Sequence, residues 1–244
     1  EICACLVGSE MCIRDRPYAY CKFAVLNPEL TCTLPPYQTA SGCTDIIVHT
    51  LERYFTKPGV TSLALTDGMA EALLRNVMRN ARLALQKPAD YDVRAEIMWA
   101  GTLSHNDITG DRSQGDWASH QLEHELGGMF DIAHGAGLAA IWGSWARYVL
   151  KQNPCRFAQL AVNVLNVPYS FGNDEKTALE GIAAMEDFFR SIGMPTSISD
   201  MEIEVTDTQI KELAHKCSFM GRRTIGGFVI LNAADMENIY RMAR

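Results

Sequence analysis

Residues 116–137, DWASHQLEHELGGMFDIAHGAG, carry the most informative side chains of the chain. They include three of its six histidines: His120, His124 and His134. His120 and His124 are four residues apart in a segment of helical character, so both imidazoles project from one helix face. His134 comes ten residues later, beside two glycines and ahead of a long apolar run. The segment therefore predicts a helix, a short turn and a second helix, on which imidazoles converge as around a divalent metal ion.

A second segment, SGCTDIIVHTLERY at residues 41–54, complements the first. Asp45 and His49 are four residues apart there, and they share one face of another expected helix. Cys43 lies on a different face and is not counted as a ligand. Pairs of this spacing are commonly structural or solvent-facing. On spacing alone, both that interpretation and a metal site stay open, as does the choice of ligands among the clustered histidines.

The order Asp45-x3-His49, followed about seventy residues later by His120-x3-His124-x9-His134, resembles the iron-containing (group III) alcohol dehydrogenases. The resemblance is greatest to their butanol dehydrogenase or aldehyde reductase branch, and it extends over about residues 20–244. Matching words include FAVLNPELTCTLPP, TDGMAEALLRNVMRNA and EIMWAGTLSHND. The resemblance implies a metal site made by Asp45, His49, His120 and His134. It implies that His124 is a catalytic histidine beside the nicotinamide and the substrate, outside the metal ligands.

The resemblance also implies the cofactors. Iron (Fe²⁺) is the metal of the family, although one carboxylate with three imidazoles suits Zn²⁺ as well. NADP or NAD supplies or accepts the hydride. A metal ion of this kind polarises an alcohol or aldehyde oxygen, so the expected function is a metal-dependent NAD(P)-linked alcohol dehydrogenase or aldehyde reductase. The ordinary pKa of imidazole, about 6.5, would let His124 relay the alcohol proton, and packing of the cleft wall is its alternative role.

The fold is expected to be mainly α, a helical bundle preceded by a short strand-forming segment, because nearly everything after Pro36 has helical periodicity. Asn173-Asp174 and Thr206-Asp207 are typical helix starts, and Thr66-Asp67 is a third. The nine expected helices are residues 37–56, 67–86, 90–105, 117–128, 135–151, 154–165, 175–192, 206–220 and 233–243.

The N-terminal part of the chain differs from the rest. Residues 1–16 match no part of the family pattern, and we expect them to be a foreign or disordered leader. Residues 17–36 predict short strands. The resemblance implies that they remain from a nucleotide-binding domain and that residues 37–244 are an all-helical metal-binding domain. The sequence has no glycine-rich phosphate-binding loop. The resembled enzymes carry such a loop in an N-terminal dinucleotide-binding domain, so the resemblance implies a fragment that lacks most of that domain and is inactive by itself.

Composition limits the partners. A net charge of −7 argues against nucleic acid. The longest uncharged run, residues 135–146, is twelve residues long, against about 20 for a membrane-spanning helix, so no membrane partner is expected. Eight scattered cysteines suggest a reduced, cytoplasmic protein. The expected partner is a small-molecule alcohol or aldehyde, and a homo-oligomer stays open.

Other functions and weaker site candidates also stay open. A non-catalytic helical fragment could bind metal without a dinucleotide. A metal-dependent phosphohydrolase is a more distant alternative, because the His-Asp dipeptide of that class does not occur in the sequence. Glu123 and Glu125 flank His124, and either could hydrogen-bond a ligand histidine. His105 is expected to be solvent-facing or structural.

Overall fold

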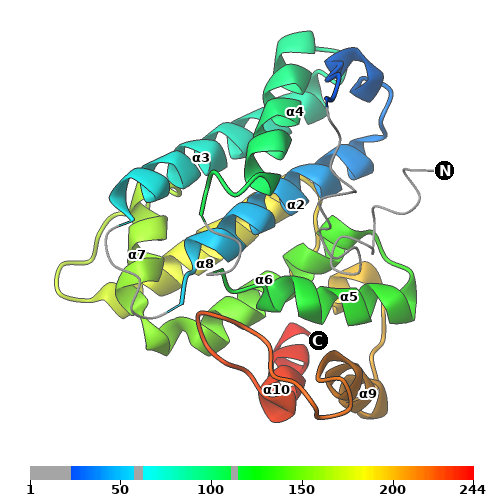
Figure 1. Cartoon of the computed structure of the whole chain (residues 1–244), viewed down its shortest axis with the longest axis vertical. Coiled ribbons are helices and arrows are strands. Elements are labelled where there is room, and N and C mark those ends of the chain that lie inside the picture. Colours follow the sequence, from blue (N-terminus) through cyan, green and yellow to red (C-terminus); the bar gives the residue numbers. More distant parts are fainter. Residues whose placement is uncertain (1–22, 58–62, 111–114) are drawn as a thin grey trace.

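The computed structural model describes residues 23–57, 63–110 and 115–244, and in these ranges the chain forms nine α-helices and no β-strand (Figure 1). All nine expected helices are confirmed, each end within three residues of its expected position, and the expected mainly α fold is confirmed with them. None of these helices combines the length and the apolar composition that crossing a membrane requires. The helices are α2 (Pro36–Tyr54), α3 (Ala64–Gln86), α4 (Tyr91–His105), α5 (Ala118–Phe130), α6 (His134–Val149), α7 (Pro154–Asn163), α8 (Asp174–Ser191), α9 (Asp207–Cys217) and α10 (Ala233–Ala243).

The expected N-terminal strands are not formed in the part of residues 17–36 that the structure describes. Residues 23–27 have no regular structure, and a 3₁₀ helix, η3 (Pro28–Thr31), follows them. The side chain of Asn27 accepts a hydrogen bond from the Glu29 N–H and caps this turn. A strand needs a neighbour for its backbone hydrogen bonds, and within the described residues this segment pairs with none. The leader expected at residues 1–16 lies outside the described residues, as do residues 17–22.

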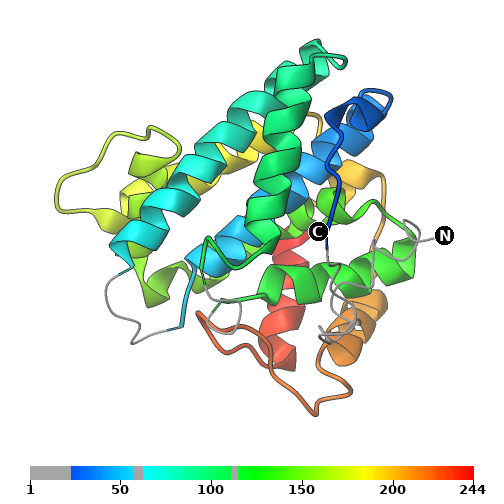
Figure 2. The same ribbon diagram turned by 45° about the horizontal axis from the view of Figure 1, so that its top comes forward.

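Helix α2 is the central element of the bundle. It packs against α3, α4, α5 and α6, and these neighbours bury most of its residues. Figure 2 shows α4 crossing in front of α2, while α5 and α6 lie on its other side. Helices α9 and α10 support α5 and α6 in turn. A residue on α2 can therefore meet side chains from three neighbouring helices.

The first turn of α6 approaches α2 so closely that a glycine is required there. A Cβ atom on Gly135 would lie 2.0 Å from the carbonyl oxygen of Ser41, far inside van der Waals contact. The two backbones therefore touch at this point. This contact places His134, the residue before Gly135, beside the first half of α2.

Candidate metal centre

Four side chains, from α2, α5 and α6, converge on one face of α2. Asp45 and His49 belong to α2, His120 to α5, and His134 is the first residue of α6. Oδ1 of Asp45 lies 3.6 Å from Nε2 of His49, 3.7 Å from Nε2 of His120 and 3.3 Å from Nε2 of His134. The structure thus places the three predicted histidine ligands around one oxygen of Asp45, which is the fourth predicted ligand.

The distances from Oδ1 of Asp45 to the three imidazoles fit a shared cation better than they fit direct hydrogen bonds. Hydrogen bonds to nitrogen are commonly about 2.7–3.2 Å long. Ligand atoms of a tetrahedral ion with bonds of about 2.1 Å lie about 3.4 Å apart. In the described part of the chain, Oδ1 of Asp45 and Nε2 of His120 are buried without a hydrogen-bond partner. Buried polar atoms of this kind are costly unless a ligand satisfies them, so the donor set fits a divalent metal ion.

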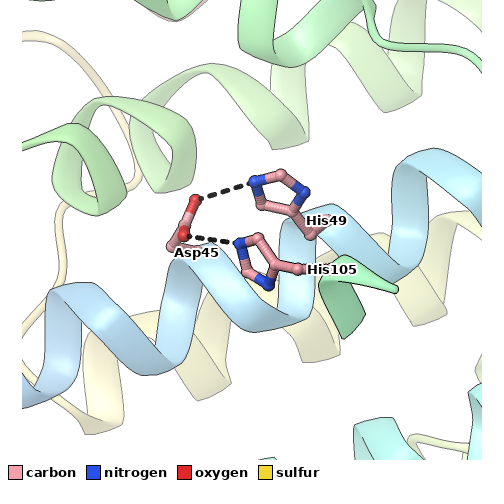
Figure 3. A group of neighbouring side chains, drawn as sticks. All are labelled: Asp45, His49 and His105. Carbon is pink, nitrogen blue, oxygen red and sulfur yellow. Dashed lines mark ion pairs between the residues drawn. The ribbon is translucent and has the colours of Figure 1, made fainter. Parts of the chain in front are cut away.

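A fifth side chain, His105 at the end of α4, also reaches Asp45. Its Nε2 lies 3.5 Å from Oδ2 of Asp45, and its ring centre is 3.9 Å from that of His49 (Figure 3). Two groups of possible ligands share Asp45, and within each group the ligand atoms lie within 4.8 Å of one another. Asp45 forms one group with His49 and His105, and the other with His120 and His134. His105 therefore does more than face solvent, and spacing missed it because it has no paired ligand on its own helix.

A buried glutamate orients His120. Nδ1 of His120 donates a hydrogen bond to Oε1 of Glu52 at 3.1 Å, and the backbone N–H of His120 donates to the same oxygen at 3.1 Å. Both side chains are only 2% exposed. A carboxylate only accepts, so Nδ1 carries a proton, and in the neutral ring Nε2 turns its lone pair towards Asp45. Glu52 lies seven residues after Asp45 on the same face of α2, so helical spacing could have identified it.

Glu123 orients His134 in the same way. Its Oε2 accepts a short hydrogen bond from Nδ1 of His134, which leaves Nε2 to face Asp45. Burial alone would lower the pKa of His134, but the adjacent carboxylates of Asp45 and Glu123 outweigh it and raise this pKa to about 10. A third possible ligand group, Glu123 with His124 and His134, is explained by this orienting contact. Of the two glutamates that flank His124, Glu123 is the one in contact with a predicted ligand.

The site carries strong negative charge. Asp45 has a pKa well below its usual value, because the charge of His49 and contacts with the other imidazoles outweigh the opposite effect of burial. Glu52 and Glu123 add two further carboxylates directly behind the imidazoles. These carboxylates attract positive charge. A divalent cation would supply that charge and would also bind the lone pairs of the imidazoles.

His124 lies at the edge of the cluster. It follows His120 by one turn of α5, and their ring centres are 6.2 Å apart. Its ring stacks on that of His134, with centres 5.4 Å apart and planes 23° from parallel. Neither ligand group around Asp45 includes it. This position is compatible with the role outside the metal ligands that was predicted for His124.

The sequence of the bundle also matches a known family. Residues 39–244 match the "Fe-containing alcohol dehydrogenase family, C-terminal", so the chain belongs to the iron-containing alcohol dehydrogenases. It is 36% identical over 225 residues to the probable NADH-dependent butanol dehydrogenase 1 of Bacillus subtilis, which covers 92% of this chain and 57% of that relative. It is 35% identical over 222 residues to the NADPH-dependent aldehyde reductase YqhD of Escherichia coli, covering 91% and 56%.

Solved structures give the same result. The substrate- and cofactor-free form of YqhD superposes with a TM-score of 0.82 at 35% identity, over 91% of this chain and 57% of that one. The NADH-dependent butanol dehydrogenase A of Thermotoga maritima gives a TM-score of 0.80 at 31% identity, over 88% and 54%. The chain thus spans a little over half the length of these relatives. The family and the branch expected from the sequence are confirmed.

Proposed function

We propose that the complete protein is a metal-dependent NAD(P)-linked alcohol dehydrogenase or aldehyde reductase, and that this chain provides its metal centre. The observation that carries the proposal is the single oxygen, Oδ1 of Asp45, with three imidazole Nε2 atoms at 3.3–3.7 Å. The names of the relatives, which specify butanol or aldehyde and NADH or NADPH, support a small primary alcohol or aldehyde and either nucleotide. The family name supports Fe²⁺, and the donors also suit Zn²⁺.

In this proposal each residue of the cluster has a defined task. Asp45, His49, His120 and His134 hold the ion. The ion supplies a Lewis acid for the oxygen of the alcohol or aldehyde. Glu52 and Glu123 keep the proton of each neighbouring imidazole on Nδ1, so that Nε2 is available inside the site.

His124 is the residue proposed to move a proton. It is partly exposed, so it can exchange protons with solvent, and its stacked position beside His134 places it next to the ion's ligands. An imidazole can accept the proton that an alcohol loses and return it in the direction of aldehyde reduction. The alternative task of His124 is to form the cleft wall. Only the proton-transfer task would make the pH dependence of turnover depend on His124.

The proposed function is tested by making turnover depend on the metal. Joined to the dinucleotide-binding half of a relative, the chain should catalyse alcohol-dependent reduction of NAD⁺ or NADP⁺. Elemental analysis of the anaerobically purified protein should find about one Fe or Zn per chain. Chelation should abolish turnover and added Fe²⁺ should restore it, because the ion activates the substrate oxygen. Turnover that persists after elemental analysis shows the metal to be gone would contradict the proposal.

Substitution of His124 separates proton transfer from metal binding. In the same joined enzyme, His124→Ala should lower turnover about 10²-fold or more, since it removes a general acid–base group, while the metal content stays normal. The acid limb of the pH–rate profile should flatten as well. His215→Ala, which changes an exposed histidine of α9, is the control and should leave both measurements unchanged. An unaltered pH profile in His124→Ala would leave this histidine a structural role only.

A further inference from the structure

Trp117 packs against two of the predicted metal ligands, which come from different helices. It is the residue before α5, and its ring meets those of His49 and His120 edge-on, with ring centres 5.5 Å apart in both cases. The centres of the two imidazoles are themselves 4.4 Å apart, so the three rings form a closed triangle. The guanidinium of Arg53 lies 4.9 Å from the centre of the indole ring, and it donates hydrogen bonds to the carbonyl oxygens of His49 and Ser104. The indole therefore limits the rotation of both imidazoles.

The backbone of Trp117 has a strained conformation, which Asp116 holds in place. Its φ of 62° and ψ of 10° lie in the left-handed region, whereas the residue before a helix is usually extended and bulky residues rarely adopt positive φ. Oδ2 of Asp116 accepts a hydrogen bond from the N–H of Ala118 at 3.1 Å, and this bond closes a turn around Trp117. The backbone N–H of Asp116 donates to the carbonyl oxygen of Glu52 in α2 at 2.8 Å. Strain of this kind persists only where the surrounding structure imposes it, and it is concentrated at functional sites.

The second oxygen of the Asp116 carboxylate binds a segment from far along the chain. Oδ1 accepts hydrogen bonds from the N–H groups of Gly227 and Phe228, at 2.9 and 2.7 Å. Asp116 is only 2% exposed, so both of its oxygens are used inside the protein. It joins three parts of the fold: α2, the start of α5 and the segment before α10. An asparagine at this position would have one acceptor oxygen and would give up one of the two side-chain anchors.

We propose that Trp117 is a positioning residue of the metal centre: its indole, fixed by Asp116, sets the orientation of His49 relative to His120. The two imidazoles belong to different helices, so the packing of each helix does not by itself fix the angle between their lone pairs. Glu52 orients His120 through Nδ1, and the indole is a contact that His120 shares with His49. Groups that orient metal ligands commonly change the metal affinity about 10–100-fold. The inference rests on the proposed function, because it requires that the cluster binds a metal ion.

Cobalt binding to the chain itself tests the inference, because the visible spectrum of Co²⁺ depends on the geometry of its ligands. Trp117→Gly removes the indole, and glycine adopts a positive φ without strain. We expect this variant to bind Co²⁺ about 10-fold more weakly or worse, with an altered visible spectrum, while Trp117→Phe, which retains a ring, keeps most of the affinity. Trp99→Ala, which removes an exposed indole from α4, is the matched control and should match the wild type. Urea unfolding with a chelator present shows that each variant is folded before metal is added.

Substitution of Asp116 tests whether this residue acts through the indole. Asp116→Asn should also weaken Co²⁺ binding, because it releases one anchor of the turn around Trp117. The double variant with Trp117→Gly should then bind Co²⁺ no more weakly than Trp117→Gly alone. Additive losses would show that Asp116 acts independently of the indole, and they would overturn the proposed link between the two residues.

The possible outcomes distinguish the inference from the proposed function. If the wild type binds one Co²⁺ and Trp117→Gly binds it with the same affinity and spectrum, the indole has no positioning role and the proposed metal centre stands. Equal losses in Trp117→Phe and Trp117→Gly would also overturn the inference, because a ring would not then restore the geometry. If the wild type binds no divalent ion, the metal centre itself is wrong, and the inference with it.

An NMR measurement on the wild type does not depend on the folding of Trp117→Gly. The indole N–H signal that Trp117→Phe lacks belongs to Trp117. This signal should move when paramagnetic Co²⁺ binds, because the indole packs on the rings of two ligands. A Trp117 signal that stays in place while Co²⁺ binds would overturn the inference.

Discussion

The His120→Ala variant is expected to retain almost no metal and to unfold at a clearly lower urea concentration than the wild type. The substitution removes an imidazole whose Nε2 is buried 3.7 Å from Oδ1 of Asp45. It also deprives the buried Glu52 carboxylate of its imidazole partner, 3.1 Å away. Removing one member of a buried charged pair commonly costs about 3 kcal/mol or more. Elemental analysis measures the first effect, and urea unfolding with a chelator present measures the second without any contribution from metal.

Three further variants make this result specific. His134→Ala should also lose most of the metal, because it removes the imidazole closest to Oδ1 of Asp45. His124→Ala should keep the metal, because neither ligand group around Asp45 includes it. Glu52→Gln should be intermediate, with metal affinity about 10–100-fold lower, because it weakens the orientation of His120 without removing a ligand. Full metal stoichiometry in His120→Ala would show that this histidine is no ligand.

The second large effect is expected from Gly135→Ala. An added Cβ atom would lie 2.0 Å from the carbonyl oxygen of Ser41, which is backbone and cannot move without displacing α2. Overpacking of this severity should cost about 3 kcal/mol or more of unfolding free energy. Intrinsic helix propensity alone would predict a gain in stability, because it favours alanine over glycine by about 1 kcal/mol. The urea midpoint measures the loss, and metal content should fall as well, because His134 is the neighbouring residue.

Gly42→Ala is the matched control for Gly135→Ala. Gly42 lies in α2, is exposed, and has no atom within 4 Å of the position of an added Cβ. Helix propensity alone should act there, so the variant should be more stable than the wild type by up to about 1 kcal/mol. Equal stability of Gly135→Ala and wild type would contradict the close contact between α2 and α6.

Helix positions could be predicted from the sequence because they depend on periodicity and on local capping. The side chains of Asn173 and Thr206 accept the expected capping hydrogen bonds at the starts of α8 and α9. The start of α3 was misplaced, since the helix begins at Ala64 and not after Thr66. Asp67, expected near the cap, instead accepts two hydrogen bonds from Arg156 of α7. A contact between residues 89 positions apart cannot be inferred from local pattern.

The site was predictable only where its residues lie close together in sequence. The spacing of Asp45 and His49 placed both on one face of α2. That face meets α5 and α6 only through tertiary packing. The family resemblance implied this contact, and residue spacing could not. His105 was missed for the same reason, because it reaches Asp45 only through the packing of α4 on α2.

The approach of His134 to Asp45 also affects the freedom of the unfolded chain. Their ligand atoms lie 3.3 Å apart, while the residues are 89 positions apart in sequence (134 − 45). An ion bound to both would act as a removable cross-link across this loop. Closing a loop of this length costs about 4.6 kcal/mol of chain entropy. If an ion stayed bound to both residues during unfolding, the denatured chain would be restricted. The segment from α2 to α6 could then expand fully only after the ion is released.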